Sequence, residues 1–288
     1  MRVLAFGSYD ARSHPRIGVL IGGLRERGAD VTELNVPLGL DTAARVAILR
    51  QPWRLPLLGW QLLRCWTRLG WQGLRLRRRG AHPDAVLVGY LGHFDVHLAR
   101  LLFPRSRIVL DQLVFAADTA RDRGERGRGK ARLLTALDTA AVRAADIVVV
   151  DTAEHRALLA PGDRAKAVVV PVGAPREWFG LRAGADRGES PLRMVFFGLF
   201  TPLQGTPVVG AALGLVADER GIEALMIGHG QDLVTARAAA AANPRVSWRH
   251  WVPPEELPGL VASHDVCLGI FGTGPKALRV VPNKVYQG

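Results

Sequence analysis

Glycines that follow strand-like runs in the second half of the sequence could bind a diphosphate. The apolar run 193–197 ends at Gly198, and Gly205 precedes a helical pattern. A glycine at a strand end lets a ligand approach the backbone closely. The start of the following helix offers amide hydrogens and the positive end of the helix dipole, which favour a phosphate group and need no metal ion. Gly228 and Gly230 form a second glycine cluster after another strand-like run.

Basic residues could supply the positive charge that a diphosphate requires. Lys276, Arg279 and Lys284 lie close together in the last segment of the sequence. In open α/β sheets, ligands bind beyond the carboxyl ends of the strands, and both glycine clusters fall at such ends. Each of the three cations could instead be a solvated surface charge. The sequence therefore predicts a phosphate site formed by strand-end glycines and leaves open which cation completes it.

Titratable residues follow strand-like runs in the first half as well. His93 and Asp95 lie in the turn after the run 85–88, where the carboxylate could orient the imidazole. A lone histidine in such a turn could equally be structural. Asp118 and Asp122 follow a later run, and their carboxylates could bind hydroxyl groups of a ligand or form surface ion pairs.

Arginine and tryptophan are concentrated between Asp41 and Asp84, where the sequence has no acidic residue. Arginine attracts anionic lipid, and tryptophan prefers the boundary between water and hydrocarbon. We expect an amphipathic helix on a membrane surface. The alternatives are a helical hairpin packed on the sheet and a nucleic-acid groove with stacking aromatic rings. The residues expected to face the membrane are Trp53, Trp60, Arg64, Trp66, Arg68, Trp71 and Arg75.

Short aliphatic runs alternate with helical patterns along the chain, which is typical of doubly wound α/β domains with parallel sheets covered on both faces. The polar, glycine-rich stretch 181–191 separates two such series. We therefore expect one Rossmann-like domain over residues 1–180, a linker, and a second over 192–288. Because the chain stops just as a helix begins after Pro282, the second domain is expected to be incomplete. The strand-like runs are 2–6, 31–34, 85–88, 107–110, 147–150, 167–170, 193–197, 223–227, 246–250 and 266–270.

Composition limits the classes of function. The 288 residues include 38 Lys and Arg against 26 Asp and Glu, and the net charge of +12 favours anionic partners. Cys65 and Cys267 are the only cysteines, which argues against a disulfide framework and a thiolate metal site and favours a reducing compartment. No signal peptide or membrane span is predicted, so we expect a cytoplasmic protein. Walker, zinc-protease, serine-hydrolase and dinucleotide motifs do not occur.

The second half resembles the donor domain of glycosyltransferase family 4, also called group 1, whose GT-B architecture has two facing Rossmann-like domains. The resemblance runs through most of the chain and is best over residues 196–287. The sequence departs from the family where Leu199 and Gln204 replace the usual Arg and Lys, and where Gln287 replaces a Glu. The matching features are Gly198, the Gly228-x-Gly230 loop, HWVPPEEL at 250–257, His264-Asp265-Val266 and Pro282-Asn283-Lys284.

The resemblance implies a retaining hexosyltransferase that uses a nucleoside diphosphate sugar, without metal ion or cofactor, on a glycan or lipid-linked acceptor at the inner membrane face. In the first domain it places His93 against the donor sugar, with Asp95 beside it as the second catalytic candidate. The donor residues that it implies are Gly198, Gln204, Gly205, Gly228, Gly230, Lys276, Arg279, Asn283, Lys284 and Gln287. The acceptor-side residues are Ser8, Tyr9, Arg12, His14, Asp118 and Asp122.

Two other functions remain open from the sequence. A sugar-nucleotide epimerase would share the two-domain shape, although it needs no lipid acceptor and so leaves the Arg and Trp segment unexplained. Leu199, Gln204 and Gln287 favour a third function, a membrane-associated protein whose donor site has decayed. No specific nucleic-acid partner is expected.

Overall fold

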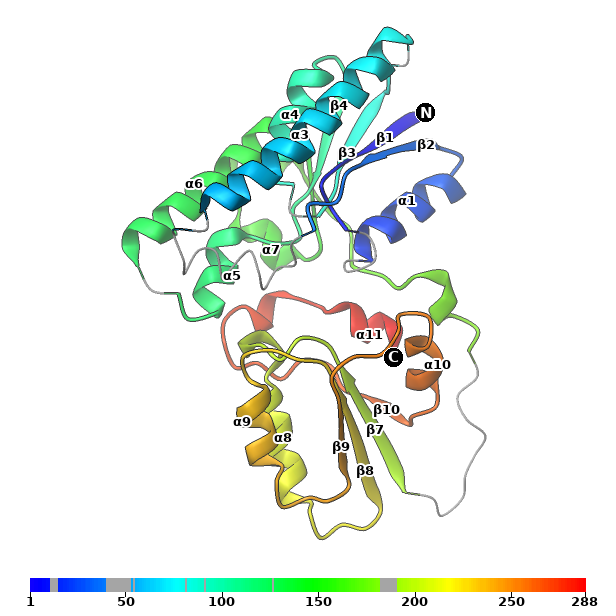
Figure 1. Ribbon diagram of the computed structural model, residues 1–288, viewed down its shortest axis with the longest axis vertical. Coiled ribbons are helices and arrows are strands. Elements are labelled where there is room, and N and C mark those ends of the chain that lie inside the picture. Colours follow the sequence, from blue (N-terminus) through cyan, green and yellow to red (C-terminus); the bar gives the residue numbers. More distant parts are fainter. Residues whose placement is uncertain are drawn as a thin grey trace. The chain divides into compact units, whose positions relative to one another are not determined.

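The computed structural model describes residues 1–10, 15–39, 53, 55–80, 82–90, 92–125, 127–181 and 191–288. The chain forms two compact units, Met1–Pro171 and Val172–Gly288 (Figure 1). Their boundary lies before the expected end of the first domain at residue 180. Most of the expected linker, residues 182–190, lies outside the described residues.

Unit 1 contains a six-stranded sheet in the order β2-β1-β3-β4-β5-β6. Every neighbouring pair is parallel. The sheet therefore has the parallel, doubly wound character that the sequence predicts, with all carboxyl ends at one edge. Its strands are β1 (Arg2–Gly7), β2 (Asp30–Asn35), β3 (Ala85–Val88), β4 (Arg107–Asp111), β5 (Ile147–Val150) and β6 (Ala167–Val169).

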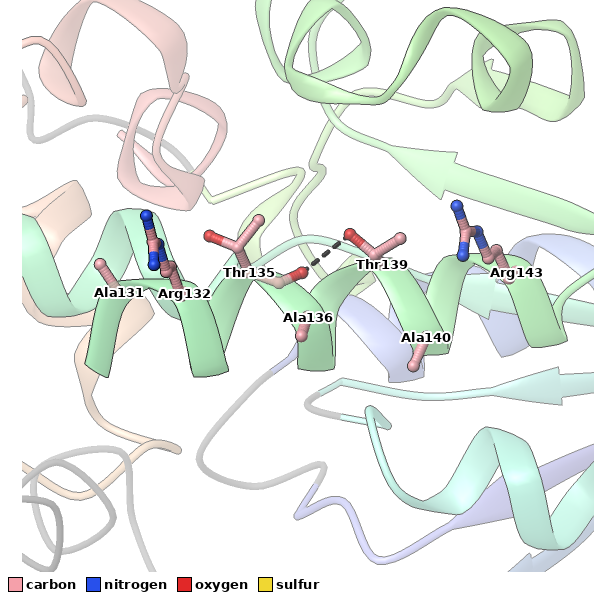
Figure 2. Close-up of a pocket in the computed structure, with 7 residues that line it drawn as sticks. All are labelled: Ala131, Arg132, Thr135, Ala136, Thr139, Ala140 and Arg143. Atoms are coloured by element: carbon pink, nitrogen blue, oxygen red, sulfur yellow. Dashed lines mark hydrogen bonds between the residues drawn. The ribbon is translucent and has the colours of Figure 1, made fainter. Parts of the chain in front are cut away.

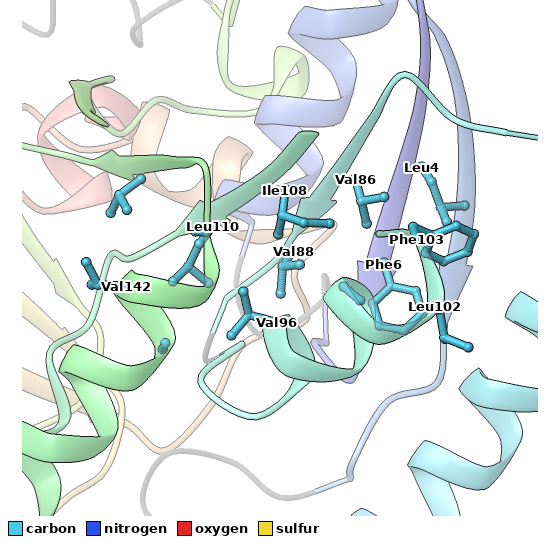
Figure 3. Close-up of a cluster of buried hydrophobic side chains, with 14 of the residues drawn as sticks. Leu4, Phe6, Val86, Val88, Val96, Leu102, Phe103, Ile108, Leu110 and Val142 are labelled. Carbon is cyan, nitrogen blue, oxygen red and sulfur yellow. The ribbon is translucent and has the colours of Figure 1, made fainter. Parts of the chain in front are cut away.

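Helices cover both faces of this sheet, which explains the continuous aliphatic strands. Leu4 and Phe6 of β1 pack in one buried cluster, which Figure 3 shows with Val88 of β3. Val3 and Ala5 alternate with them and pack in a second cluster. Each large apolar side chain buried in this way stabilises the fold by about 1.5–3 kcal/mol. The helices are α1 (Arg16–Glu26), α3 (Leu55–Arg78), α4 (Asp95–Leu102), α5 (Ala116–Asp122), α6 (Arg128–Ala144), α7 (Ala153–Leu158) and the 3-10 helix η2 (Pro161–Lys166).

Unit 2 contains a four-stranded parallel sheet in the order β10-β7-β8-β9. Its strands are β7 (Leu192–Phe197), β8 (Ile222–Ile227), β9 (Val246–Arg249) and β10 (Val266–Cys267). Its helices are α8 (Thr206–Leu215), α9 (Leu233–Ala239), α10 (Leu257–Ala262), α11 (Asn283–Gln287) and the 3-10 helices η3 (Arg176–Trp178), η4 (Pro202–Gln204) and η5 (Ala277–Arg279). Buried clusters lie on both faces of this sheet too.

Two local expectations change. The strand expected at 266–270 is only Val266–Cys267, because after the bond from the Leu268 amide to the Val195 carbonyl the chain turns to pack on the loop after β7. The segment rich in Arg and Trp forms the single 24-residue helix α3 over residues 55–78, so it is not a helical hairpin there. Among the described helices, none combines the length and apolar character needed to cross a bilayer.

Candidate functional site

The loops after the strands of unit 2 pack against one another at the carboxyl edge of its sheet. The Phe200 amide donates to the His229 carbonyl at 2.8 Å, and the Phe271 amide donates to the Gln204 carbonyl at 3.0 Å. Gly228 has φ 135°, and a Cβ on it would lie 1.9 Å from the Gly198 carbonyl oxygen. Only glycine fits there, because a side chain would force the two loops apart. The loops at the tips of β7, β8 and β10 therefore pack together.

Gly205 forms the turn between this edge and helix α8. It is left-handed at φ 63°, and a Cβ on it would lie 2.1 Å from the carbonyl carbon of Phe271. The helix that follows offers fewer amide donors than expected, because Pro207 in its first turn has no amide hydrogen. Thr206 adds a different donor, since its buried hydroxyl makes no hydrogen bond to the part of the chain that the structure describes.

Lys284 places a buried amine against the glycine turn. Its Nζ donates to Oε1 of Gln204 at 2.7 Å and lies 3.7 Å from the centre of the Phe196 ring. A Cβ on Gly198 would lie 3.3 Å from the same nitrogen, so the amine closely approaches the end of β7. The residue is 5% exposed. Residues 80 positions apart in the sequence thus form one polar contact at the strand tips.

Burial decides the charge of this amine. Removal from water disfavours an ammonium ion and lowers the pKa of Lys284 to about 7, while the nearby Cys267 acts weakly in the opposite direction. An aromatic face and an amide oxygen stabilise a cation less than a carboxylate would. Near neutral pH the amine of Lys284 therefore lies close to its titration midpoint.

The remaining predicted donor residues lie in the segment that leads to and includes α11. Lys276 precedes η5 and Arg279 ends it, while Asn283 and Gln287 are the first and last residues of α11. All four side chains are partly buried. Gly230 packs against the backbone of Phe200. A Cβ added to Gly230 would lie 2.3 Å from the Phe200 carbonyl oxygen. Six of the ten predicted donor residues lie together, either in direct contact or in loops that contact each other. They are Gly198, Gln204, Gly205, Gly228, Gly230 and Lys284.

A stacked histidine pair stands near these loops and is not among the sequence predictions. The rings of His229 and His250 lie 4.7 Å apart and are inclined by 22°. The residues follow β8 and β9, and the neighbouring Trp251 is 63% exposed. The two histidines could have been predicted to lie close together, because they follow strands β8 and β9, which are neighbours in the sheet. The three flat side chains could offer a stacking surface to a planar ring.

In unit 1, His93 is part of a buried network. Its Nε2 lies 2.8 Å from Oδ1 of Asp138 on α6, and the Gln112 amide nitrogen lies 3.2 Å from the same ring nitrogen. In the tautomer that carries its hydrogen on Nε2, the His93 ring donates to the Asp138 carboxylate. Asp138 also accepts the amides of Ala116 and Ala117 at the start of α5. The sequence analysis missed Asp138. It could have been found as the single acidic residue on the otherwise apolar buried face of α6.

The prediction that Asp95 orients His93 is wrong. Asp95 is 2% exposed, and its Oδ2 accepts both the amide and the hydroxyl of Ser8 at 2.7 Å. Its Oδ1 accepts the indole hydrogen of Trp66 at 2.9 Å. The carboxylate therefore joins β1, α3 and α4 and contributes to the structure of the strand tips. The same bond shows that Trp66 points inward, so the prediction that it faces a membrane is also wrong.

The predicted acceptor-side residues have different positions. Ser8 is held by Asp95, while the ring of Tyr9 is 1% exposed within an apolar cluster, so Tyr9 is a core residue and not an acceptor contact. Burial raises the pKa of its hydroxyl well above the usual range. Asp118 and Asp122 lie on α5, the first buried and the second partly so. The other two predicted residues, Arg12 and His14, lie outside the described residues.

Solved structures share this arrangement of two parallel sheets. Sucrose-phosphate synthase from Thermosynechococcus elongatus is 11% identical, with a TM-score of 0.63 over 92% of this chain and 74% of that one. The catalytic domain of starch synthase IV from Arabidopsis thaliana, bound to ADP and acarbose, is 10% identical, with a TM-score of 0.58 over 92% and 76%. Anabaena HepE in complex with UDP and glucose is 13% identical, with a TM-score of 0.56 over 96% and 75%.

The chain has the GT-B fold. UDP-GlcNAc 2-epimerase from Neisseria meningitidis, bound to UDP-GlcNAc, is also similar, at 12% identity and a TM-score of 0.51 over 92% of this chain and 77% of that one. No protein-family model matches the chain, and no curated protein matches its sequence. The fold is therefore established by structure alone.

A second buried charge cluster supports the GT-B strand tips in unit 1. Arg16 on α1 donates to Asp111 at 2.8 Å and to the Val170 carbonyl at 3.0 Å. Burial raises the pKa of Asp111, and Arg16 opposes this effect. Beside it, Asp151 pairs with His155 of α7. The Thr152 hydroxyl accepts the His155 amide at 3.1 Å and so caps α7.

A shallow hollow on helix α6 carries no comparable chemistry. It has a volume of about 470 Å³, and in Figure 2 its walls come from the side chains along one helix. The Thr139 hydroxyl donates to the Thr135 carbonyl of the same helix at 2.8 Å, so it is already satisfied. Groups of three or more metal-ligating side chains do not occur among the residues that the structure describes. The hollow is lined by Ala131, Arg132, Thr135, Ala136, Thr139, Ala140 and Arg143.

Proposed function

We propose that this protein transfers a hexosyl group from a nucleoside diphosphate sugar to a hydroxyl of a glycan or lipid-linked acceptor. One observation carries the proposal: the amine of Lys284 lies against Gly198 and Gln204 at the carboxyl edge of the parallel sheet in unit 2. This edge is where open α/β sheets bind ligands. The similar structures that hold ADP or UDP support a nucleotide as the donor's leaving group.

The proposed reaction breaks the bond between the sugar C1 and the diphosphate oxygen and forms a bond from C1 to the acceptor oxygen. The acceptor hydroxyl loses its proton to solvent or a base, and the nucleoside diphosphate leaves. Positive charge on Lys284 stabilises the leaving diphosphate, and the start of α8 adds the positive end of a helix dipole. This chemistry uses no metal ion or cofactor. The transfer is retaining in our proposal, as in glycosyltransferase family 4, to which we assign the chain.

His93 is proposed to contact the donor sugar, with Asp138 holding its ring. In the tautomer that donates from Nε2 to Asp138, the opposite ring nitrogen, Nδ1, is left as an acceptor. An acceptor nitrogen can receive a hydrogen bond from a sugar hydroxyl. The acceptor itself is proposed to bind to unit 1, where Ser8 and the α5 residues Asp118 and Asp122 are the candidates.

A calorimetric titration with UDP, ADP and GDP tests the donor site first. We expect one of them to bind with a stoichiometry of one, and binding of none would show that the donor site has decayed. The matching nucleotide sugars, offered with a mixture of glycan and lipid-linked acceptors, then test the reaction. A labelled sugar attached to an acceptor supports the proposal. A labelled nucleotide sugar whose configuration is inverted at one sugar carbon, with no sugar transferred to an acceptor, would contradict the proposal.

That last outcome is the second candidate function, a sugar-nucleotide epimerase. The similarity to the 2-epimerase from Neisseria meningitidis favours it, because that protein shares the fold and is bound to UDP-GlcNAc. Epimerisation needs a base that removes a proton next to the reacting carbon. In the described residues the network around His93 is the candidate, so product analysis separates the two functions.

A further inference from the structure

Helix α3 presents large apolar side chains to solvent. Trp60 and Trp71 are 64% and 62% exposed, and Trp53, just before the helix, is 73% exposed. Leu57 and Leu74 are exposed as well. Within α3, Leu57, Trp60, Trp71 and Leu74 are separated by whole numbers of helical turns, so they lie on one side of the helix. We call this side the outer face of α3, and it comprises Leu57, Trp60, Leu63, Arg64, Thr67, Arg68, Trp71, Leu74, Arg75 and Arg78.

The opposite side of α3 is fixed to unit 1. Leu69 is fully buried, and Cys65 is 7% exposed. The Trp66 indole donates to Asp95, and Gly73 packs so closely on Leu102 that a Cβ would lie 2.9 Å from it. The helix therefore cannot turn its outer face inward without breaking the core. The exposed tryptophans are a permanent feature of the folded unit.

Positive charge is interleaved with these apolar side chains. Arg64, Arg68 and Arg75 are exposed on the same side, and the guanidinium of Arg75 lies 5.4 Å from the centre of the Trp71 ring. The helix contains no acidic residue. The neighbouring strand β2 carries Asp30 and Glu33, and Glu33 already pairs with Arg25 at 2.8 Å. The outer face thus combines an apolar stripe with cations that its own helix does not neutralise.

We propose that the outer face of α3 binds an anionic lipid bilayer and lies in its headgroup plane. A helix with a basic and apolar exposed side fits this position, because the rings of Trp reach the acyl boundary while Arg stays among the phosphates. A partner helix would need acidic residues to match these arginines. The proposal does not depend on sugar transfer, because it concerns a surface of unit 1 alone.

The test is co-sedimentation of the full chain with vesicles. One set contains phosphatidylcholine alone, and the other contains equal parts of phosphatidylcholine and phosphatidylglycerol. We expect binding to the mixed vesicles to be at least about tenfold stronger, since several arginines each contribute to attraction by the surface. Raising the salt concentration should weaken it. Equal binding to the two sets, or none to either, would overturn the proposal.

Matched variants locate the surface. The double variant Trp60→Ala and Trp71→Ala should lose most binding, about tenfold or more, whereas Trp251→Ala, which removes an equally exposed ring from unit 2, should not. Likewise Arg64→Gln with Arg68→Gln should weaken binding, and Arg105→Gln with Arg132→Gln should not. All these side chains are exposed, so circular dichroism should show an unchanged fold. If the α3 variants lose affinity for single-stranded RNA and keep it for vesicles, the face is a nucleic-acid site.

Discussion

Replacing Lys284 by methionine removes the buried amine while keeping a long unbranched side chain. The shift of its pKa from 10.5 to about 7 corresponds to about 5 kcal/mol in favour of the neutral amine in the folded protein. The unfolded chain protonates the same amine freely, so at neutral pH this difference destabilises the fold. Losing the hydrogen bond to Gln204 and leaving its oxygen unpaired costs about 1–3 kcal/mol. We therefore expect Lys284→Met to raise the free energy of unfolding at pH 7 by about 2–4 kcal/mol.

The sign follows from proton binding. Between pH 7 and 10.5 the unfolded chain binds more protons at Lys284 than the folded chain does, so the stability of the wild type rises with pH in this window. Urea denaturation across this window should show that rise as a difference between wild type and Lys284→Met. Arg220→Met is the control, because Arg220 is an exposed cation at the amino end of β8. Arg220→Met should keep the wild-type rise of stability with pH.

Lys284→Met should weaken nucleotide binding although it stabilises the fold. Lys284→Met should weaken the preferred nucleoside diphosphate by about a hundredfold, because a buried cation-to-phosphate hydrogen bond contributes on the order of 3 kcal/mol. In the wild type, affinity should fall by up to about tenfold per pH unit above pH 7, where binding must recharge the amine. Calorimetry measures both effects. A variant that binds the nucleotide as tightly as the wild type would refute the assignment of Lys284, whatever its stability.

Three further predictions concern the supporting network. Asp138→Asn should lower the transfer rate at least about tenfold and leave nucleotide affinity unchanged, because it removes the carboxylate that holds His93; steady-state kinetics beside calorimetry checks this. Gly228→Ala should destabilise unit 2 by about 3 kcal/mol or more, measured by urea denaturation, and normal stability would mean that the loops are not packed as described. Arg16→Met should cost about 3–5 kcal/mol, because it leaves the buried Asp111 carboxyl without its charge and hydrogen-bond partner, and Arg16→Met with Asp111→Leu should recover much of that loss.

The fold could be predicted because its signals are local. Leu4 and Val3 point to opposite faces of β1, and both faces are covered, so an unbroken aliphatic run was sufficient to indicate a buried parallel strand. The strand-end glycines were equally visible, since the Gly228 turn requires a residue without a side chain. The short length of β10 could not be predicted, because it depends on how the following chain packs on the distant loop after β7.

The partners of the site residues could not be predicted from spacing. His93 meets Asp138 across 45 positions, whereas the nearby Asp95 turns toward Ser8 and Trp66. Nearness in sequence suggested the wrong carboxylate, because the first turn of α4 directs Asp95 back to β1. The inward direction of Trp66 was equally hidden, because Trp66 lies on the side of α3 that packs on unit 1, where its indole donates to the buried Asp95 carboxylate. Tertiary packing decides such contacts.

Hydrogen–deuterium exchange with and without the preferred nucleoside diphosphate tests the central claim most directly. If the strand tips of unit 2 bind the diphosphate, exchange should slow in the segments 198–208 and 283–287, and Lys284→Met should abolish the slowing at the same nucleotide concentration. Protection confined to other segments, or none at a concentration that saturates binding, would contradict the claim.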